Sequence, residues 1–191
     1  MVALTSDQKR QRLQRAGRPI TRIQYQALSK DTFQNIWWAA NKAIFCQAAR
    51  AKWPNILPQI NGLINDFEAW GNNSQCSYLV YEQGINKAVA VVNDTEANGS
   101  HITARYILTN GASAGLGALI LTTVLQWSDE RNKSGQLRLI ANNDFLENLY
   151  TTTYGFTVHQ ASTMISGAVL HLNARTSPKW ISLNGTWLFR G

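Results

Sequence analysis

The sequence is short of charge and contains no long apolar run. Only 15% of its 191 residues are charged, whereas 45% are hydrophobic. No stretch of about 18 apolar residues occurs, so no segment is expected to span a membrane. This is the composition of a globular protein, and its low charge indicates some apolar surface, which leaves a homodimer open. The length suits one domain with one sizeable core.

Cysteine and histidine are also scarce. Two cysteines, Cys46 and Cys76, are too few for a disulfide framework, so reduced, buried thiols in a cytoplasmic protein are expected. The first twenty residues lack the apolar run of a signal peptide, which also favours the cytoplasm. Neither zinc-ligand spacing nor a serine nucleophile elbow occurs. We therefore expect no metal centre and no serine triad.

The positive charge is concentrated in the first quarter of the chain. Residues 1–52 contain ten Lys/Arg and two Asp/Glu, a balance of +8, whereas residues 53–191 contain eight and nine, a balance of −1. We interpret residues 1–18 as a basic arm that precedes a single domain of residues 19–191. Either a solvated tail or the docking of an acidic peptide or carrier protein explains the arm. No recognised DNA- or RNA-binding motif occurs, which disfavours nucleic acid as a partner.

The hydrophobic pattern predicts an α/β fold, and residues 177–191 stay unassigned. Alternation and short apolar runs predict strands at residues 20–28, 76–82, 87–93, 101–109, 137–141, 156–164 and 168–173. Helical spacing predicts helices at residues 6–16, from Ser29 to before Pro54, and at 58–70, 116–129 and 142–154. Without the basic arm the order is β-α-α-β-β-β-α-β-α-β-β. This order predicts a mixed, mostly antiparallel twisted sheet flanked by helices.

A loop of small residues joins the strand that ends near Thr109 to the apolar helix after it. It reads Asn110-Gly111-Ala112-Ser113-Ala114-Gly115-Leu116-Gly117. Glycine at a helix start lets a ligand approach the backbone closely. The amides of the first helical turn, together with the helix dipole, favour an anion such as a pyrophosphate. The glycine pattern by itself is weak evidence, because a tight turn explains it as well.

This part of the chain resembles the GCN5-related N-acetyltransferase (GNAT) superfamily. Gly115-Leu116-Gly117 is similar to the end of that family's pyrophosphate loop, (Gln/Arg)-x-x-Gly-x-(Gly/Ala). About thirty residues later, Asn143, Leu149-Tyr150 and Gly155-Phe156 resemble its "Asn…Leu-Tyr…Gly-Phe" block. The resemblance covers roughly residues 20–173, and its specific motifs lie within 103–156.

The chain departs from the family pattern in two places. Ala112 stands where the family has Gln or Arg, so one polar contact to the cofactor is missing. Tyr150 lies five steps before Gly155, whereas the family usually has four. The extra residue is therefore expected in Thr151–Thr153, and either Tyr150 or Tyr154 takes the position of the family's general acid.

The resemblance implies a GNAT-like fold and direct transfer of an acyl group from acyl-CoA to a primary amine of a small molecule, peptide or protein. The donor is acetyl-CoA by default or a longer acyl-CoA. A backbone donor for the oxyanion is expected between Leu108 and Asn110. Tyr150 or Tyr154 is expected to protonate the leaving thiolate, although a core aromatic is an equal reading of Tyr150. The cofactor-binding residues that it implies are Leu108, Thr109, Asn110, Ala112, Ser113, Ala114, Gly115, Leu116, Gly117, Ala118, Asn142 and Asn143.

The general base is not identified by the sequence. Residues 99–126 contain no Asp or Glu, and Asp94, Glu96, His101 and His159 are candidates by residue type only. A water-relayed base, or an acceptor that arrives deprotonated, fits equally well. The alternative function is a non-catalytic GNAT-like module that binds a cofactor or an acidic partner.

Overall fold

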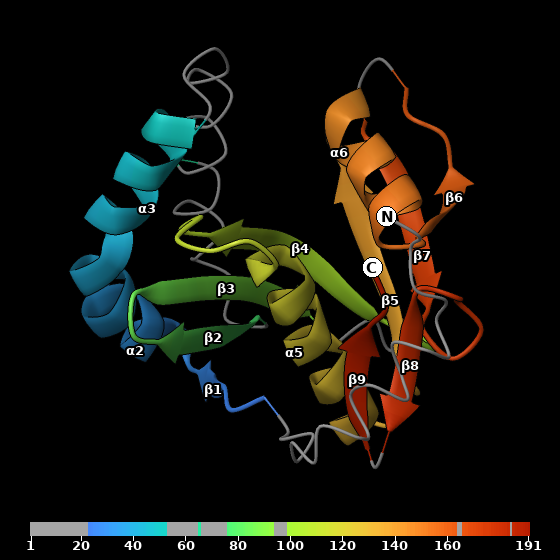
Figure 1. Cartoon of the computed structure of the whole chain (residues 1–191), viewed down its shortest axis with the longest axis horizontal. Helices are drawn as coiled ribbons and strands as arrows, with labels where there is room; N and C mark the ends of the chain where they lie inside the picture. The colour runs from blue at the N-terminus through green and yellow to red at the C-terminus, as the bar shows by residue number, and fades with distance from the viewer. Residues whose placement is uncertain (1–22, 53–64, 66–75, 94–98, 164–165, 184) are drawn as a thin grey trace, which may run out of the picture.

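The computed structural model describes residues 23–52, 65, 76–93, 99–163, 166–183 and 185–191. The basic arm lies outside these residues, and so does the predicted helix at 58–70 apart from residue 65. The described elements form a mostly antiparallel sheet with helices on both faces, which confirms the predicted fold class (Figure 1).

The sheet has the strand order β1-β2-β3-β4-β5-β7-β6. Neighbouring strands are antiparallel throughout, except for β4 and β5, which are parallel. The strands are β1 (Gln26–Leu28), β2 (Ser77–Gln83), β3 (Asn86–Asn93), β4 (Ile102–Thr109), β5 (Gln136–Ala141), β6 (Thr157–Gln160) and β7 (Ala168–Asn173).

One face of the sheet is covered by the first helical segment. It consists of α2 (Lys30–Thr32), the π-helix η1 (Phe33–Trp38) and α3 (Ala39–Lys52). Ser29 caps its start, as predicted, because the Ser29 side chain accepts a hydrogen bond from the Thr32 amide. Phe33 stacks on Tyr78 of β2, with ring centroids 4.3 Å apart.

A hydrophobic core lies between this helical segment and the sheet, and we call it the second core. Trp37 and Trp38 are buried in it. Its buried members are Phe33, Trp37, Trp38, Phe45, Cys76, Tyr78, Val80, Val89 and Val91.

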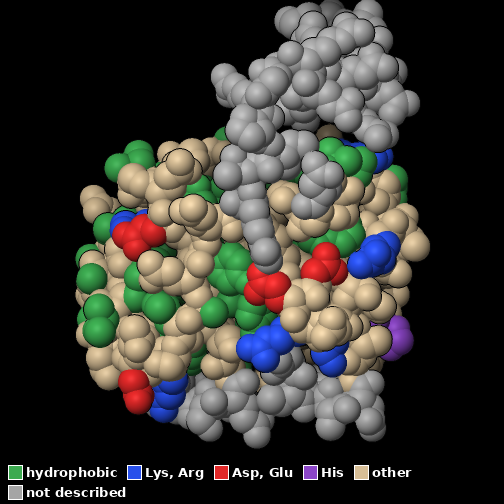
Figure 2. Space-filling model, turned by 90° about the horizontal axis from the view of Figure 1, so that it is seen from below, with side chains coloured by type: hydrophobic (Ala, Val, Ile, Leu, Met, Phe, Trp, Pro, Cys, Tyr) green, Lys and Arg blue, Asp and Glu red, His purple; other side chains and the backbone are tan. Residues whose placement is uncertain are grey.

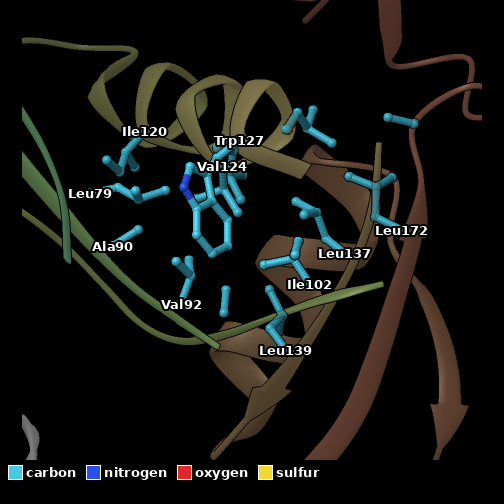
Figure 3. Packing of buried hydrophobic residues seen from close by; sticks show 14 of the residues in the cluster. Leu79, Ala90, Val92, Ile102, Ile120, Val124, Trp127, Leu137, Leu139 and Leu172 are labelled. Carbon is cyan, nitrogen blue, oxygen red and sulfur yellow. The ribbon is translucent and has the colours of Figure 1, made fainter. Parts of the chain in front are cut away.

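The main core lies between the opposite face and α5 (Leu116–Glu130), with α6 (Asp144–Asn148) and the π-helix η3 (Leu149–Thr153) beside it. Figure 3 shows Ile120, Val124 and Trp127 of α5 directed at the sheet. The sheet residues that they meet include Leu79, Ala90, Val92, Ile102, Leu137, Leu139 and Leu172. Because β2 and β3 are covered on both faces, they read as continuous apolar runs rather than as alternating patterns.

Two strand predictions need correction, and one region that was left unassigned contains strands. Within the described residues, the first strand comprises Gln26–Leu28, which pair with β2, whereas residues 23–25 of the predicted strand at 20–28 are not part of it. The strand predicted at 156–164 is the short edge strand β6, which is exposed along its length. Residues 177–191, which sequence periodicity did not assign, contain a hairpin of β8 (Trp180–Leu183) and β9 (Thr186–Phe189).

Figure 2 shows acidic and basic side chains scattered among hydrophobic ones, without a large patch of one sign on the face in view. Across the part of the chain that the structure describes, no helix combines the length and the apolar character needed to cross a membrane.

Candidate functional site

β4 and β5 are parallel neighbours that separate along their length, as Figure 1 shows. They pair at three positions only, ending at Ala104 and Leu139. Beyond this point β4 continues to Thr109 beside no other strand on its β5 side, within the described residues. An open strand edge offers hydrogen-bond donors and acceptors to an extended molecule. We call the opening between residues 107–109 and β5 the β4–β5 wedge.

A β-bulge explains why the two strands separate. Val91 pairs with Tyr106 whereas Val92 pairs with Ala104, so Arg105 is the extra residue of the bulge. As a result, Ala104 packs in the main core while Tyr106, two residues later, packs against the second core. Bulges bend a strand and increase its twist, and here the bend turns the end of β4 away from β5.

The direction of the backbone groups in the wedge follows from one hydrogen bond. The Asn110 amide donates to the Lys87 carbonyl of β3 at 3.0 Å. Amides alternate in direction along an antiparallel strand, so the Leu108 amide also faces β3, while those of Ile107 and Thr109 face the wedge. Of the three residues in which an oxyanion donor was expected, only Thr109 therefore presents its amide to the opening.

The start of α5 lies at the end of the same strand. Gly115 precedes the helix with a left-handed φ of 87°, which glycine adopts without strain. The Leu119 amide makes the first helical bond, to the Gly115 carbonyl at 3.0 Å. The amides of Leu116, Gly117 and Ala118 precede it, so they have no acceptor within the helix. No acidic residue occupies this first turn, which leaves the positive end of the helix dipole uncompensated.

The Asn110 side chain is already used to hold the strand end together. Its Nδ2 donates to the Ile85 carbonyl at 2.6 Å. Its Oδ1 accepts from the amides of Lys87, at 3.2 Å, and Ala112, at 3.3 Å. Asn110 is buried, so it shapes the loop rather than presenting a polar group to a ligand.

The other predicted binding residues divide into exposed and internal positions. The Asn143 side chain caps α6 by accepting from the Leu146 amide at 2.9 Å. Leu116 is buried in the main core, so only its backbone groups are available, whereas Leu108 packs against the second core and its amide faces β3. The exposed positions are Ala112, Ser113, Ala114, Gly115 and Asn142.

The extra residue in the second motif has a structural counterpart. Leu149–Thr153 form the π-helix η3, whose turn holds one residue more than an α-helical turn. The π-helix therefore contains Thr151–Thr153, where the extra residue was expected. The Tyr150 ring packs between Tyr154 and Phe156, with centroid distances of 5.9 Å and 5.5 Å. Burial is the main cause of a raised pKa of Tyr150, and the neighbouring Tyr154 adds to it, so the phenol stays protonated at neutral pH.

The Tyr154 hydroxyl lies against the first turn of α5. A Cβ built on Gly117 would overlap with this hydroxyl, so the phenol occupies the space that glycine leaves. The Trp180 Nε1 donates to the Tyr154 carbonyl at 2.8 Å, and the Phe189 ring lies 5.3 Å from the Tyr154 ring. Sequence reasoning missed Trp180 and Phe189, because the only signal was the richness of the tail in Trp and Gly.

The two candidate histidines lie with the third histidine rather than in the wedge. His159 stacks on His171 at a centroid distance of 4.1 Å, and His101 lies 5.0 Å from His171. Asp94 and Glu96, the other candidates, fall outside the described residues. Among the residues that are described, no group of three or more His, Cys, Asp or Glu is arranged to hold a metal ion.

A separate cleft of about 630 Å³ opens beside β1. Both carboxylates that line it are engaged: Glu82 accepts from Trp37 Nε1 and pairs with Lys87, and Glu130 accepts from the Tyr25 hydroxyl. None of its described lining residues belongs to the wedge. They are Ile23, Gln24, Tyr25, Gln26, Ala27, Val80, Glu82 and Glu130.

The structure therefore brings together, along the end of β4 and the start of α5, the elements on which the sequence resemblance rests. The described residues form the mixed, mostly antiparallel sheet flanked by helices that the resemblance implied. No protein-family model matches the sequence, and no curated protein sequence matches it significantly.

Several solved structures are similar to this fold. One is an acyl-CoA N-acyltransferase from Pseudomonas aeruginosa, with a TM-score of 0.48 and 12% identity over 78% of this chain and 99% of that one. Another is the PaiA N-acetyltransferase from Thermoplasma acidophilum in complex with coenzyme A, with a TM-score of 0.42 and 13% identity over 79% and 98%. A third is an N-acetyltransferase from Staphylococcus aureus Mu50, with a TM-score of 0.41 and 15% identity over 80% and 98%. The likeness is one of fold alone.

Proposed function

We propose that this protein is an acyl-CoA-dependent N-acyltransferase that transfers an acyl group to a primary amine. One observation carries the proposal: the open edge of β4, the free amides at the start of α5 and the Tyr154 hydroxyl meet in one region of the structure. An extended molecule with amide groups at one end and an anionic group at the other fits this arrangement. An acyl-CoA is such a molecule, since its pantetheine arm carries amides and its other half carries a pyrophosphate.

The residues at the site match the parts of that ligand. The backbone groups of Ile107 and the Thr109 carbonyl face the wedge and can pair with the amides of the pantetheine arm, as an added strand would. The amides of Leu116, Gly117 and Ala118 suit the pyrophosphate, because the helix N-terminus combines free donors with a favourable dipole. The exposed, small side chains of the preceding loop leave this turn accessible.

Acyl-CoA supplies an activated thioester, and the protein's own groups support the attack of the amine. The Thr109 amide is the donor for charge that develops on the thioester oxygen, since it points into the opening. Tyr150 is the proposed general acid, because it holds the tyrosine position of the second motif and its phenol carries a proton at neutral pH. The described residues contain no carboxylate or imidazole in the wedge, so the acceptor loses its proton to water or arrives deprotonated.

Calorimetry with coenzyme A tests the binding part of the proposal. Gly115→Ala places a methyl group at the exposed start of α5, and we expect the dissociation constant for coenzyme A to rise at least tenfold. Gly185→Ala is the matched control: Gly185 also has a positive φ, 74°, and its Cβ would likewise meet nothing within 4 Å. Both variants carry the same kind of backbone strain, but only the first should lose affinity. Equal affinities in the two folded variants would contradict the assignment of the loop.

Thiol release from acetyl-CoA, measured with a panel of amines, tests the catalytic part. Amine-dependent release supports the proposed transfer, and longer acyl-CoA donors in the same assay report the preferred chain length. A protein that binds coenzyme A but releases no thiol with any amine would be a non-catalytic binding module. A protein that does not bind coenzyme A would lack the proposed function altogether.

A further inference from the structure

The C-terminal hairpin joins two parts of the molecule that the sheet does not connect. At one end, Trp187 is 1% exposed and its Nε1 donates to Asp129 near the end of α5 at 2.7 Å. At the other end, Trp180 is 3% exposed and its Nε1 donates to the Tyr154 carbonyl, just beyond η3. The hairpin therefore fixes the end of η3 relative to α5 through two buried indole groups.

The same hairpin also holds the Tyr154 ring. Phe189 of β9 contacts Tyr154 at a centroid distance of 5.3 Å and Trp180 at 5.1 Å. Tyr150 contacts the Tyr154 ring as well, at 5.9 Å. With its carbonyl bonded and its ring packed between neighbours, Tyr154 has little freedom to move away from α5.

The hydroxyl of Tyr154 has a fixed position, but the described residues do not use it. It lies at Gly117, in the first turn of α5, and it makes no hydrogen bond to any other described residue. Partial burial raises the pKa of Tyr154, so the group is a neutral donor at neutral pH. The hydroxyl therefore lies beside the free amides of this turn, as a further neutral donor.

We infer that the Tyr154 hydroxyl is a ligand for the anionic part of the acyl-CoA, in place of the polar side chain that is missing at Ala112, and that the C-terminal hairpin holds it there. This inference rests on the proposed function. It separates the two tyrosines: Tyr150 acts on the thiolate, whereas Tyr154 contributes to binding. It also assigns a role to the tail, with Trp180 as a positioning residue that acts through Tyr154.

Calorimetry with coenzyme A tests the ligand role. Tyr154→Phe removes only the hydroxyl, and we expect the dissociation constant to rise about tenfold, as for the loss of one hydrogen bond to a charged group. Tyr25→Phe is the matched control, because Tyr25 donates its hydroxyl to Glu130 at 2.6 Å, outside the wedge. The control should bind coenzyme A as the wild type does.

A double-mutant cycle tests the positioning role of Trp180. Trp180→Phe keeps an aromatic ring but loses the indole N–H, and we expect it to raise the dissociation constant about threefold in the wild-type background. In the Tyr154→Phe background, Trp180→Phe should leave the dissociation constant unchanged, since the hydroxyl that Trp180 positions is gone. A merely structural role would lower affinity by the same factor in both backgrounds, and that result would overturn the role of the hairpin.

The outcomes separate this inference from the function on which it rests. Wild-type binding of coenzyme A together with unchanged affinity in Tyr154→Phe would overturn the ligand role and leave the proposed function standing. Absence of coenzyme A binding by the wild-type protein would overturn both.

Discussion

Tyr154 and Gly117 fit together so closely that a side chain at position 117 would overlap with the Tyr154 hydroxyl. The two residues are 37 positions apart in the sequence, yet their contact joins the start of α5 to the end of η3. Gly117 therefore serves two purposes, because it admits the phenol and leaves its own amide accessible.

The first prediction tests this contact through stability. Gly117→Ala should lower the free energy of unfolding by about 1–3 kcal/mol, since the Tyr154 ring is packed and cannot easily withdraw. Adding Tyr154→Phe removes the overlapping oxygen and should restore the free energy of unfolding, helped by the better helix propensity of alanine. Urea denaturation gives the free energy of unfolding of the wild type, the single variant and the double variant. If the single variant is as stable as the wild type, the contact is looser than the structure indicates.

The second prediction concerns the acid role of Tyr150. Tyr150→Phe should lower turnover about 100-fold or more, which is the usual range for a general acid–base step, with little change in the affinity for coenzyme A. Steady-state kinetics with the best amine acceptor gives the turnover, and calorimetry gives the affinity for coenzyme A. A loss of turnover in Tyr154→Phe but not in Tyr150→Phe would exchange the roles that we assign to the two tyrosines.

The third prediction concerns alkaline pH and the second core. Burial is the main cause, and nearby Cys76 a lesser one, that raises the pKa of Tyr78 from 10.0 to about 12. Between these values the unfolded chain loses the Tyr78 proton while the folded protein keeps it, so stability falls as the pH rises. Tyr78→Phe preserves the stacking on Phe33 and should remove up to about 2 kcal/mol of this alkaline loss.

Urea midpoints measured from pH 8 to pH 11.5 test this prediction, and the wild-type and variant curves should diverge only above about pH 10. Parallel curves over the whole range would show that Tyr78 ionises equally easily in both states. Burial raises the pKa of Tyr150 as well, so part of the wild-type decline should persist in the variant.

The fourth prediction concerns the basic arm, which lies outside the described residues. We propose that it recruits an acidic acceptor, such as a peptide or carrier protein, since residues 1–52 carry a balance of +8 and the remainder −1. Deleting residues 1–17 should raise the apparent Michaelis constant of the acceptor, leave the affinity for coenzyme A unchanged and flatten the salt dependence.

A full-length variant with serine at Lys9, Arg10, Arg12 and Arg15 is the matched control for chain length, and it should behave as the deletion does. Wild-type kinetics of the truncated protein at low salt would identify the arm as a solvated tail.

Much of the fold could be predicted because it follows from local patterns. The apolar runs of β2 and β3, the cap at Ser29 and the start of α5 after Gly115 all lie where the sequence places them. The insertion between Tyr150 and Gly155 was also visible as a spacing, and its π-helical form is the simplest way to house one extra residue. Each of these signals depends on residues close together in the chain.

The arrangement of the candidate site depends instead on contacts between distant segments. The bulge at Arg105 exists only in the register between β3 and β4, and the hydrogen bonds that occupy Asn110 come from a turn some 25 residues earlier. The placement of Tyr154 against Gly117 requires η3, α5 and the C-terminal hairpin at once. The pattern of residues sets which segments become strands and helices, because periodicity is local. Tertiary packing alone sets which backbone amides stay open and which tyrosine reaches them, because register and side-chain contact join residues that the sequence keeps far apart.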